Sequence, residues 1–360
     1  MSEHPVDLLV ETMGPGRPTI LAESGRDREF RRLAQSLRGE AERLVEDTTA
    51  QVKRTGEPVQ VFDTGIAAAV LGPTLAATPV RGVGSGAPMF AVQFSPTLAE
   101  AEQRASTIAA YEWELGLEEL PPRLLLDDRW LDLTNTGKEF RDRAIFGPQD
   151  FFRPIIRIRD IVELWEDLRR ATPDTAKIGT VLTRIDEGPL KRMHWAQRCV
   201  STDAGPRMRG LLRDVTDTVT TAEMRLELLE NRVGTESLRL QDAFGVIGDI
   251  SYPYAPLILK WLTPLVPDIG HGVSTGQTVA IHPDDFANVL QWINEAKQGR
   301  TVIGQGRVRR GGGGWLKMTF HASLLDPEFF PTIGLTLVYP ADVAVLDPVS
   351  ASDSVSRDAG

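Results

Sequence analysis

The sequence contains a single cysteine, Cys199, among 360 residues, so it cannot form an intramolecular disulfide. It also lacks an excess of positive charge, because 40 Lys and Arg residues are set against 50 Asp and Glu residues, giving a net charge of -10. These features argue against a disulfide-stabilised secreted domain, and against a phosphate backbone or an anionic membrane surface as the main partner. We therefore expect a cytoplasmic protein with no nucleic-acid partner and no membrane partner.

Long hydrophobic runs are missing as well. The longest runs, 66–80 and 257–266, are interrupted by Pro73, Lys260 and Pro264, whereas a membrane-spanning helix needs about 20 apolar residues. The N-terminus is acidic and lacks the basic start and apolar core of a signal peptide. We expect neither a membrane span nor export.

Motifs that mark common catalytic and nucleotide-binding sites are missing too. The glycine-rich segment 82–86 has neither the spacing nor the strand-to-helix context of a dinucleotide-binding loop, and no Lys-Ser or Lys-Thr follows the glycines at 311–314. Ser85 has no glycine two positions before it, so it does not form a nucleophile elbow. No acid–base or nucleophile constellation meets these tests of spacing. The sequence predicts a protein that is not an enzyme.

Enough apolar material is present for well-packed cores, since 41% of the residues are hydrophobic and 25% are charged. Domains usually contain about 100–150 residues, so a chain of this length predicts two or three domains, and we favour three. The same order of elements recurs three times: two early strands, a helical segment, and a closing set of antiparallel strands.

The third cycle has the clearest periodicity. Pro283, Asp284 and Asp285 are typical of a helix start, and apolar residues then recur at three- and four-residue spacing. Period-two alternation predicts strands over 301–309, 315–322 and 332–339. We expect one apolar face, made of Leu316, Met318, Phe320 and Ala322 together with Ile333, Leu335, Leu337 and Tyr339.

The first two cycles are interpreted in the same way. The first predicts a hairpin of 6–10 with 19–22, a long helix over 29–55, strands over 58–62, 67–71, 80–83 and 89–94, and a helix within 95–109. The second predicts strands over 111–117, 123–132, 178–185, 192–200 and 207–215, and a helix over 159–170.

A heptad-like seam follows the second cycle. Its members, at spacings of four and three, are Val215, Val219, Ala222, Leu226, Leu229 and Val233. The pattern predicts a helical linker over 217–234 that could join two copies into a homodimer. A helix packed on its own domain explains the pattern equally well.

Three short motifs carry a family resemblance. They are Leu8-Leu9-Val10-Glu11-Thr12-Met13-Gly14, His282-Pro283-Asp284-Asp285 and Trp315-Leu316-Lys317-Met318. With the three cycles, they make the chain resemble the tandem PAS-GAF-PAS proteins of bacteria, a family of sensors without an attached catalytic domain.

The resemblance implies an α+β fold with three tandem PAS/GAF-like domains, each an antiparallel sheet backed by helices. The boundaries that we expect are 1–105 for a PAS-like domain, 106–216 for a GAF- or PAS-like domain, 217–234 for the linker, 235–340 for a PAS domain and 341–360 for a disordered tail.

Domains of this kind can hold a ligand in a small cavity between sheet and helices. The side chains that could line such cavities are Trp195, Cys199, Met318 and Phe320, although core packing explains each of them as well. His282 with Asp284 and Asp285 could bind a metal, but the helix dipole explains two carboxylates at a helix start, and we expect no metal site. The cofactor stays unknown.

These observations predict a non-catalytic cytoplasmic sensory protein that binds a small molecule or a protein partner through its PAS/GAF-like domains. A structural or adaptor scaffold that binds partner chains without a ligand is the alternative. The arginines at 307, 309 and 310 are interpreted as a solvated strand end.

Overall fold

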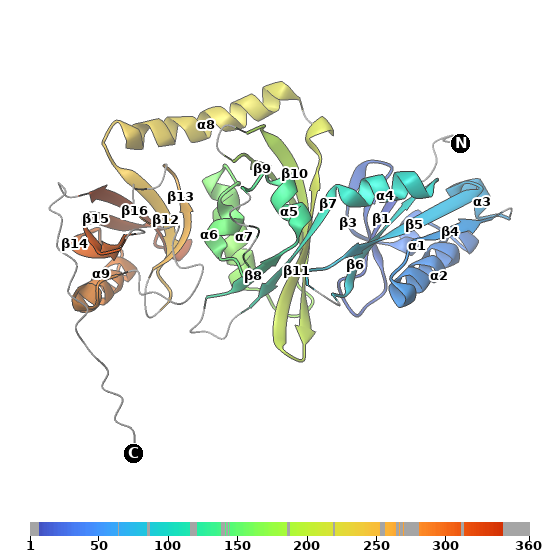
Figure 1. The fold of residues 1–360 in the computed structure, drawn as a ribbon, viewed down its shortest axis with the longest axis horizontal. Coiled ribbons are helices and arrows are strands. Elements are labelled where there is room, and N and C mark those ends of the chain that lie inside the picture. Colours follow the sequence, from blue (N-terminus) through green and yellow to red (C-terminus); the bar gives the residue numbers. More distant parts are fainter. Residues whose placement is uncertain are drawn as a thin grey trace, which may run out of the picture. The chain divides into compact units, whose positions relative to one another are not determined.

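The computed structural model describes residues 7–63, 65–84, 87–115, 121–137, 141, 143, 145–185, 188–218, 220–252, 256–263, 266, 269, 281–310 and 313–340. Its strands form three antiparallel sheets, and helices accompany each of them (Figure 1). The chain divides into two compact units, Met1–Asn231 and Arg232–Gly360. The first unit contains the first and second sheets, and the second unit contains the third.

The first sheet has six strands in the order β3-β2-β1-β6-β5-β4. They are β1 (Leu8–Glu11), β2 (Thr19–Glu23), β3 (Arg26–Arg32), β4 (Val59–Phe62), β5 (Thr74–Arg81) and β6 (Met89–Ser95). Its helices are α1 (Leu33–Ser36), α2 (Glu40–Thr55), α3 (Ala68–Leu71) and α4 (Leu98–Ser106). Val45 and Val52 of α2 are fully buried in one cluster with Leu8 and Phe94, so α2 covers one face of this sheet.

The predicted hairpin at the start is confirmed, because β1 and β2 pair antiparallel. The long helix over 29–55 is wrong in its first part. There, β3 pairs with β2, and Gly39, at a φ of 60°, separates α1 from α2. The predicted strand over 67–71 is also wrong, because Leu71 N–H donates to Ala67 C=O at 2.9 Å and the segment forms a helical turn. A short apolar run does not distinguish a strand from a helix by its period.

The second sheet has five strands in the order β8-β7-β11-β10-β9. They are β7 (Ile108–Glu114), β8 (Arg123–Leu126), β9 (Ala176–Thr183), β10 (Lys191–Thr202) and β11 (Gly205–Asp214), and the helices between β8 and β9 are α5 (Asp128–Leu133), α6 (Pro148–Phe152) and α7 (Ile158–Arg169). The predicted strand over 123–132 ends early, because the carboxylate of Asp127 accepts from Trp130 N–H at 2.8 Å and starts α5.

Aromatic side chains fill the helix-covered side of the second sheet. Phe151 of α6 lies 5.1 Å from Tyr111, 5.3 Å from Trp113 and 5.9 Å from Trp130, measured between ring centroids. Each of these three partners is at most 2% exposed. The interior of this sheet is therefore packed by large rings, whose burial is the main stabilising contribution here.

The third sheet repeats the strand order of the second. Its order is β13-β12-β16-β15-β14, so both sheets follow the sequence second, first, fifth, fourth, third when their own strands are counted. The strands are β12 (Phe244–Asp249), β13 (Leu257–Trp261), β14 (Val302–Arg309), β15 (Trp315–Asp326) and β16 (Phe330–Pro340). The predicted helix is α9 (Phe286–Lys297), preceded by the 3₁₀ turn η3 (Pro283–Asp285).

The prediction of one apolar face in the third sheet is wrong. Phe320 pairs with Val338, and His321 pairs with Leu337. Directly opposed residues of an antiparallel pair share a face. The set that contains Phe320 therefore lies on the face opposite to the set that contains Leu337. Both faces carry apolar side chains, and alternation within one strand does not reveal how it is aligned with the next.

The predicted helical linker corresponds to helix α8 (Thr221–Arg239). Four members of its seam are exposed: Ala222, Leu226 to 62%, Leu229 to 59% and Val233 to 63%. Val219 and the predicted tail 341–360 lie outside the described residues. A homodimer through 217–234 stays a prediction.

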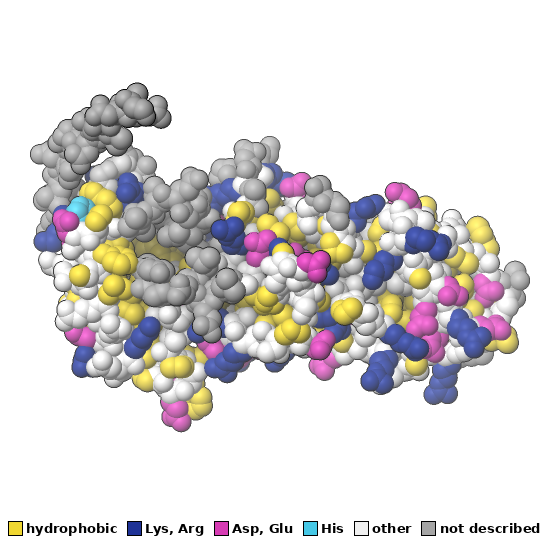
Figure 2. All heavy atoms as spheres, turned by 90° about the horizontal axis from the view of Figure 1, so that it is seen from below, with side chains coloured by type: hydrophobic (Ala, Val, Ile, Leu, Met, Phe, Trp, Pro, Cys, Tyr) yellow, Lys and Arg dark blue, Asp and Glu magenta, His cyan; other side chains and the backbone are white. Residues whose placement is uncertain are grey.

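Within the described part of the chain, no helix combines the length and the apolar composition that crossing a membrane requires. Figure 2 shows acidic, basic and hydrophobic side chains interspersed on the face that it draws. No single-sign field covers that face.

Candidate functional site

The four side chains predicted to line ligand cavities lie in two separate cores. Trp195 and Cys199 are 9% and 1% exposed in the second sheet, whereas Met318 and Phe320 belong to the apolar cluster of the third. The gap beside Trp195 measures about 10 Å³, enough for about one water molecule. Burial raises the pKa of the Cys199 thiol, which opposes formation of the reactive thiolate. In the structure as described, Trp195 and Cys199 are part of the core of the second sheet, and Met318 and Phe320 are part of the core of the third.

The predicted helix-start cluster has a structural role that the sequence did not show. Asp285 accepts three hydrogen bonds from Arg307: from the backbone N–H at 2.7 Å, from Nε at 2.9 Å and from Nη2 at 2.8 Å. His282 N–H donates to the Arg307 C=O at 2.9 Å. The guanidinium lowers the pKa of Asp285. The cluster therefore covers the outer edge of β14, and the interpretation of Arg307 as part of a solvated basic strand end is wrong.

The contact between the first and second sheets contains a buried polar group. Glu11 is 2% exposed and lies at the end of β1. Its Oε1 accepts from Met13 N–H at 2.7 Å, and its Oε2 accepts from the Thr19 hydroxyl at 2.8 Å. Arg198 of β10 donates to both oxygens, each at 3.1 Å. This two-point ion pair joins the two sheets through a buried carboxylate.

Gly14 makes room for this pair. A Cβ at Gly14 would lie 2.8 Å from Cδ of Arg198, closer than two carbon atoms can approach without displacement. The opening motif Leu8–Gly14 therefore has a physical reason at two positions, Glu11 and Gly14. A charged residue at the end of a buried apolar strand is the sequence signal that could have indicated this site.

Apolar side chains surround the ion pair. One buried cluster contains Leu9, Leu21, Val80, Phe90 and Ala91 of the first sheet with Ala110, Ala196 and Leu211 of the second. The two sheets thus pack face to face, and Ala196 and Arg198 lie on the side of β10 opposite to Trp195. Both faces of the second sheet are buried.

Phe30 connects this contact to an open hollow. The guanidinium carbon of Arg198 lies 4.7 Å above the centroid of the Phe30 ring, a cation–π arrangement. Phe30 has a φ of 46°, which is unfavourable for a bulky side chain and marks a strained backbone. The strained residue lies in β3, at the edge of the first sheet.

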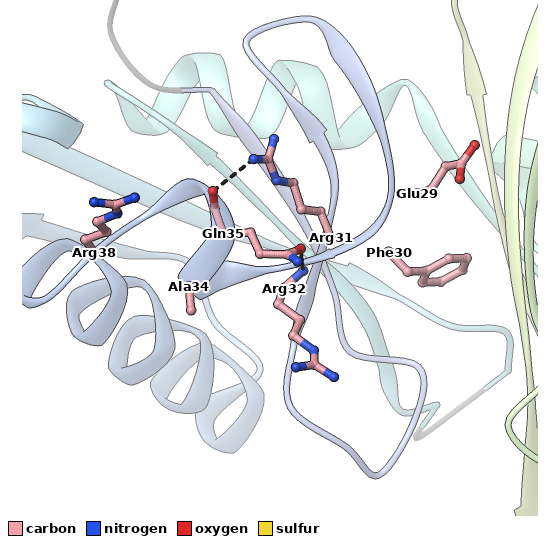
Figure 3. A pocket seen from close by; sticks show the side chains of 7 residues that line it. All are labelled: Glu29, Phe30, Arg31, Arg32, Ala34, Gln35 and Arg38. Carbon is pink, nitrogen blue, oxygen red and sulfur yellow. Dashed lines mark hydrogen bonds between the residues drawn. The ribbon is translucent and has the colours of Figure 1, made fainter.

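The hollow itself has a volume of about 1030 Å³ and is formed by β3, α1 and the residues after it (Figure 3). Its lining residues are Glu29, Phe30, Arg31, Arg32, Ala34, Gln35 and Arg38. Arg31 donates to Gln35 C=O at 2.9 Å. Figure 3 shows the guanidinium groups of Arg31, Arg32 and Arg38 pointing in different directions, and the Phe30 ring pointing away from them. The charges are thus spread along a surface, which suits an extended acidic ligand better than a compact anion.

A buried histidine lies at the same contact. His194 is 6% exposed, its Nδ1 lies 3.6 Å from Oδ1 of Asp27 in the first sheet, and Arg213 pairs with the same carboxylate. The pKa of His194 is lowered to about 4, mainly because the imidazole is buried; the Asp27 carboxylate opposes this shift and the Arg213 guanidinium adds to it. The imidazole is therefore neutral in the folded protein at pH 7.

This pKa makes the contact sensitive to acid. Because the folded-state pKa lies below the unfolded value of about 6.5, the unfolded chain binds the extra proton between pH 6.5 and pH 4. Neutral His194 makes its full contribution to the stability of the folded state above about pH 6.5, and this contribution is lost as the pH falls towards 4. We expect His194→Gln to remove up to about 3 kcal/mol of this pH dependence. Hydrogen exchange of β10 and β11 from pH 4 to 8 measures it, and equal slopes in both proteins would contradict it.

The fold described above belongs to the α+β class, with antiparallel sheets backed by helices. A family model described as "Rv3651-like, N-terminal" matches residues 7–95. The crystal structure of an uncharacterized protein from Mycobacterium tuberculosis is similar over 94% of this chain and 97% of its own, at 17% identity and a TM-score of 0.67. This likeness shows a shared fold across nearly the whole chain. No curated protein matches.

Weaker structural matches have TM-scores too low to support any inference. An RNA-binding light-oxygen-voltage receptor covers 65% of this chain and 95% of its own, at 11% identity and a TM-score of 0.26. A sensory box histidine kinase/response regulator from Burkholderia thailandensis E264 covers 40% of this chain and 99% of its own, at 15% identity and a TM-score of 0.24.

Proposed function

We propose that this protein is a non-catalytic cytoplasmic sensory or adaptor protein whose PAS-like sheets recognise an acidic segment of a protein partner. The observation that carries the proposal is Phe30, which lines the arginine hollow and also stacks on Arg198 at the contact between the sheets. A ligand that moves β3 would change the geometry around the Glu11–Arg198 pair. Recognition at the hollow would in this way reach the second sheet.

Two further features support this function. The interior of the second sheet is filled, which favours a surface site over an enclosed small-molecule site. Within the described part of the chain, the side chains of Arg32 and Arg38 make no ion pair or hydrogen bond, so their charges are available to a ligand. The second and third sheets share one strand order, and we take both as PAS-like rather than GAF-like.

Small-molecule sensing is the second candidate, and one observation favours it. Nε1 of Trp130 is buried without an acceptor among the described residues, and Trp130 lines the gap beside Trp195. An unpaired buried donor costs about 1–3 kcal/mol, which a ligand atom or a water would offset. A copurified small molecule detected by native mass spectrometry would favour this candidate.

The test of the main proposal uses fluorescein-labelled poly-glutamate as the probe and fluorescence anisotropy as the readout. We expect Arg32→Glu with Arg38→Glu to weaken binding at least tenfold, because charge reversal replaces attraction by repulsion. Lys53→Glu with Arg54→Glu, on the exposed side of α2, is the control of equal charge change. Equal weakening in both double variants would mean that only net charge matters and would overturn the proposal.

A further inference from the structure

The free edge of the first sheet carries a second surface, far along the strand order from the arginine hollow. It consists of β4 and the helical turn that follows, and its exposed apolar side chains are Phe62, Ile66 and Val70. Their exposed fractions are 75%, 72% and 49%. Single exposed apolar residues are ordinary in soluble proteins, but a cluster of large ones marks an interaction surface. Three within nine residues form such a cluster.

The helical turn presents two of these side chains together. Val70 N–H donates to Ala67 C=O at 3.0 Å, and Ala69 N–H donates to Ile66 C=O at 3.2 Å. Ile66 and Val70 are four residues apart, so they lie on the same side of the turn. The other side is buried, since Ala67 and Leu71 are 4% and 1% exposed. The core therefore holds the turn in place and leaves its second apolar side facing solvent.

The backbone of β4 is open along its outer side. Asp63 N–H donates to Pro73 C=O at 3.1 Å, which sets the phase of the ladder between β4 and β5. Because the direction of backbone groups alternates along a strand, Gln60 and Phe62 point their N–H and C=O groups away from β5. Within the described part of the chain, these outward groups have no hydrogen-bond partner. An added extended strand can pair with such a row of groups in place of water.

We propose that β4 binds an extended apolar segment of a partner protein as an added strand. The backbone of the segment would pair with Gln60 and Phe62, and its apolar side chains would pack on Phe62, Ile66 and Val70. Basic residues at the ends of the segment fit this edge, because Glu57 and Asp63 flank β4 on its two sides. The Glu57 side chain is 74% exposed and lies 3.8 Å from Arg81, a distance and exposure at which the pair contributes little.

A second copy of the chain fits this edge less well. Antiparallel pairing of two β4 strands about a two-fold axis would bring the acidic flank of one copy beside the acidic flank of the other, which is unfavourable. The three apolar side chains also expose only on the order of a few hundred Å², whereas a stable complex of two proteins buries about 800 Å² on each. A short segment matches the size of the surface.

The experiment uses the full-length protein and a fluorescein-labelled peptide, Lys-Val-Thr-Val-Thr-Val-Lys, with anisotropy as the readout. We expect Phe62→Ser with Ile66→Ser to weaken binding at least tenfold. Ile303→Ser is the matched control, because Ile303 is 66% exposed on β14, the edge strand of the third sheet. All these side chains are exposed, so the variants keep the fold, which circular dichroism verifies.

A pair of variants at one position tests the mode of binding. Gln60→Pro removes the outward N–H, and proline is tolerated at the edge of a sheet; Gln60→Ala keeps the N–H. We expect several-fold weaker binding for Gln60→Pro and unchanged binding for Gln60→Ala. Three results would overturn the proposal: no peptide binding, equal loss with Ile303→Ser, or a concentration-dependent dimer that Phe62→Ser with Ile66→Ser abolishes. The poly-glutamate test is independent, since its variants lie on β3 and just after α1.

Discussion

Glu11→Ala is expected to lower the free energy of unfolding of the first unit by about 3–5 kcal/mol, the range for breaking a buried ion pair from one side. The loss is large because five hydrogen-bond donors share the Glu11 carboxylate as their acceptor, and all five would lose it. Arg198 would keep its charge at a contact where its side chain is only 20% exposed. The N–H groups of Met13 and Gly14 and the hydroxyl of Thr19 would also lose their acceptor.

The matched control removes a carboxylate of the same type from the surface. Glu57 pairs with Arg81, and both side chains are more than half exposed, so Glu57→Ala should change stability by less than about 1 kcal/mol. Hydrogen exchange of peptides from β1 and β10 reports on the first unit alone and measures both variants. A Glu11→Ala effect no larger than the control would show that the pair does not hold the two sheets together.

Arg198→Ala and the double variant separate the pair from its surroundings. If Glu11 and Arg198 act mainly through each other, the double variant will lose less free energy of unfolding than the two single variants together. Each single variant leaves one buried charge without its partner, whereas the double variant leaves none. Exact additivity would place the role of Glu11 in its own sheet, through Met13, Gly14 and Thr19.

The parts of the fold that could be predicted are those that local periodicity determines. The stripe Phe286, Val289, Leu290, Ile293 and Ala296 predicts α9. Val289, Ile293 and Ala296 are buried, and Phe286 and Leu290 are half-buried. Alternation over 192–200 predicts β10, and turn residues between 10 and 19 predict the first hairpin. Three helix-backed antiparallel sheets follow from the recurrence of these local signals. Each of these signals lies within one element and needs no knowledge of its neighbours.

The parts that could not be predicted depend on contacts between distant residues. Glu11 and Arg198 are 187 positions apart, and no local pattern links them. The register that places Phe320 opposite Val338 is equally non-local. Residues 29–32 show a helical pattern in sequence, yet pairing with β2 makes them a strand. Tertiary contacts outweigh local preference at such places. Trp195 and Cys199 were predicted to line a cavity from the alternation of their strand, and both are buried; a ligand role for them stays a prediction.

Trp195→Ala is expected to lower the free energy of unfolding of the first unit by about 3–5 kcal/mol, the usual cost of removing a large core side chain. Trp195 packs directly over Gly179 of the neighbouring strand, where a Cβ would lie 2.7 Å from the indole ring. The existing gap beside Trp195 measures only about 10 Å³, so the side chains around the indole are already closely packed. Removing the indole would therefore create a new cavity of nearly its full volume. Hydrogen exchange of β9 and β10 measures the loss.

The same variant separates a packing role from a ligand role. Removing the indole leaves an apolar cavity, and a cavity of this kind stays dry and binds benzene. Benzene should therefore restore part of the stability of Trp195→Ala and leave the original protein unchanged. Trp315→Ala is the control, because Trp315 is half-buried against His282 and Arg309 in the third sheet, and benzene should not rescue it. If benzene instead stabilises the original protein, its second sheet already contains a binding cavity and small-molecule sensing gains support over surface recognition.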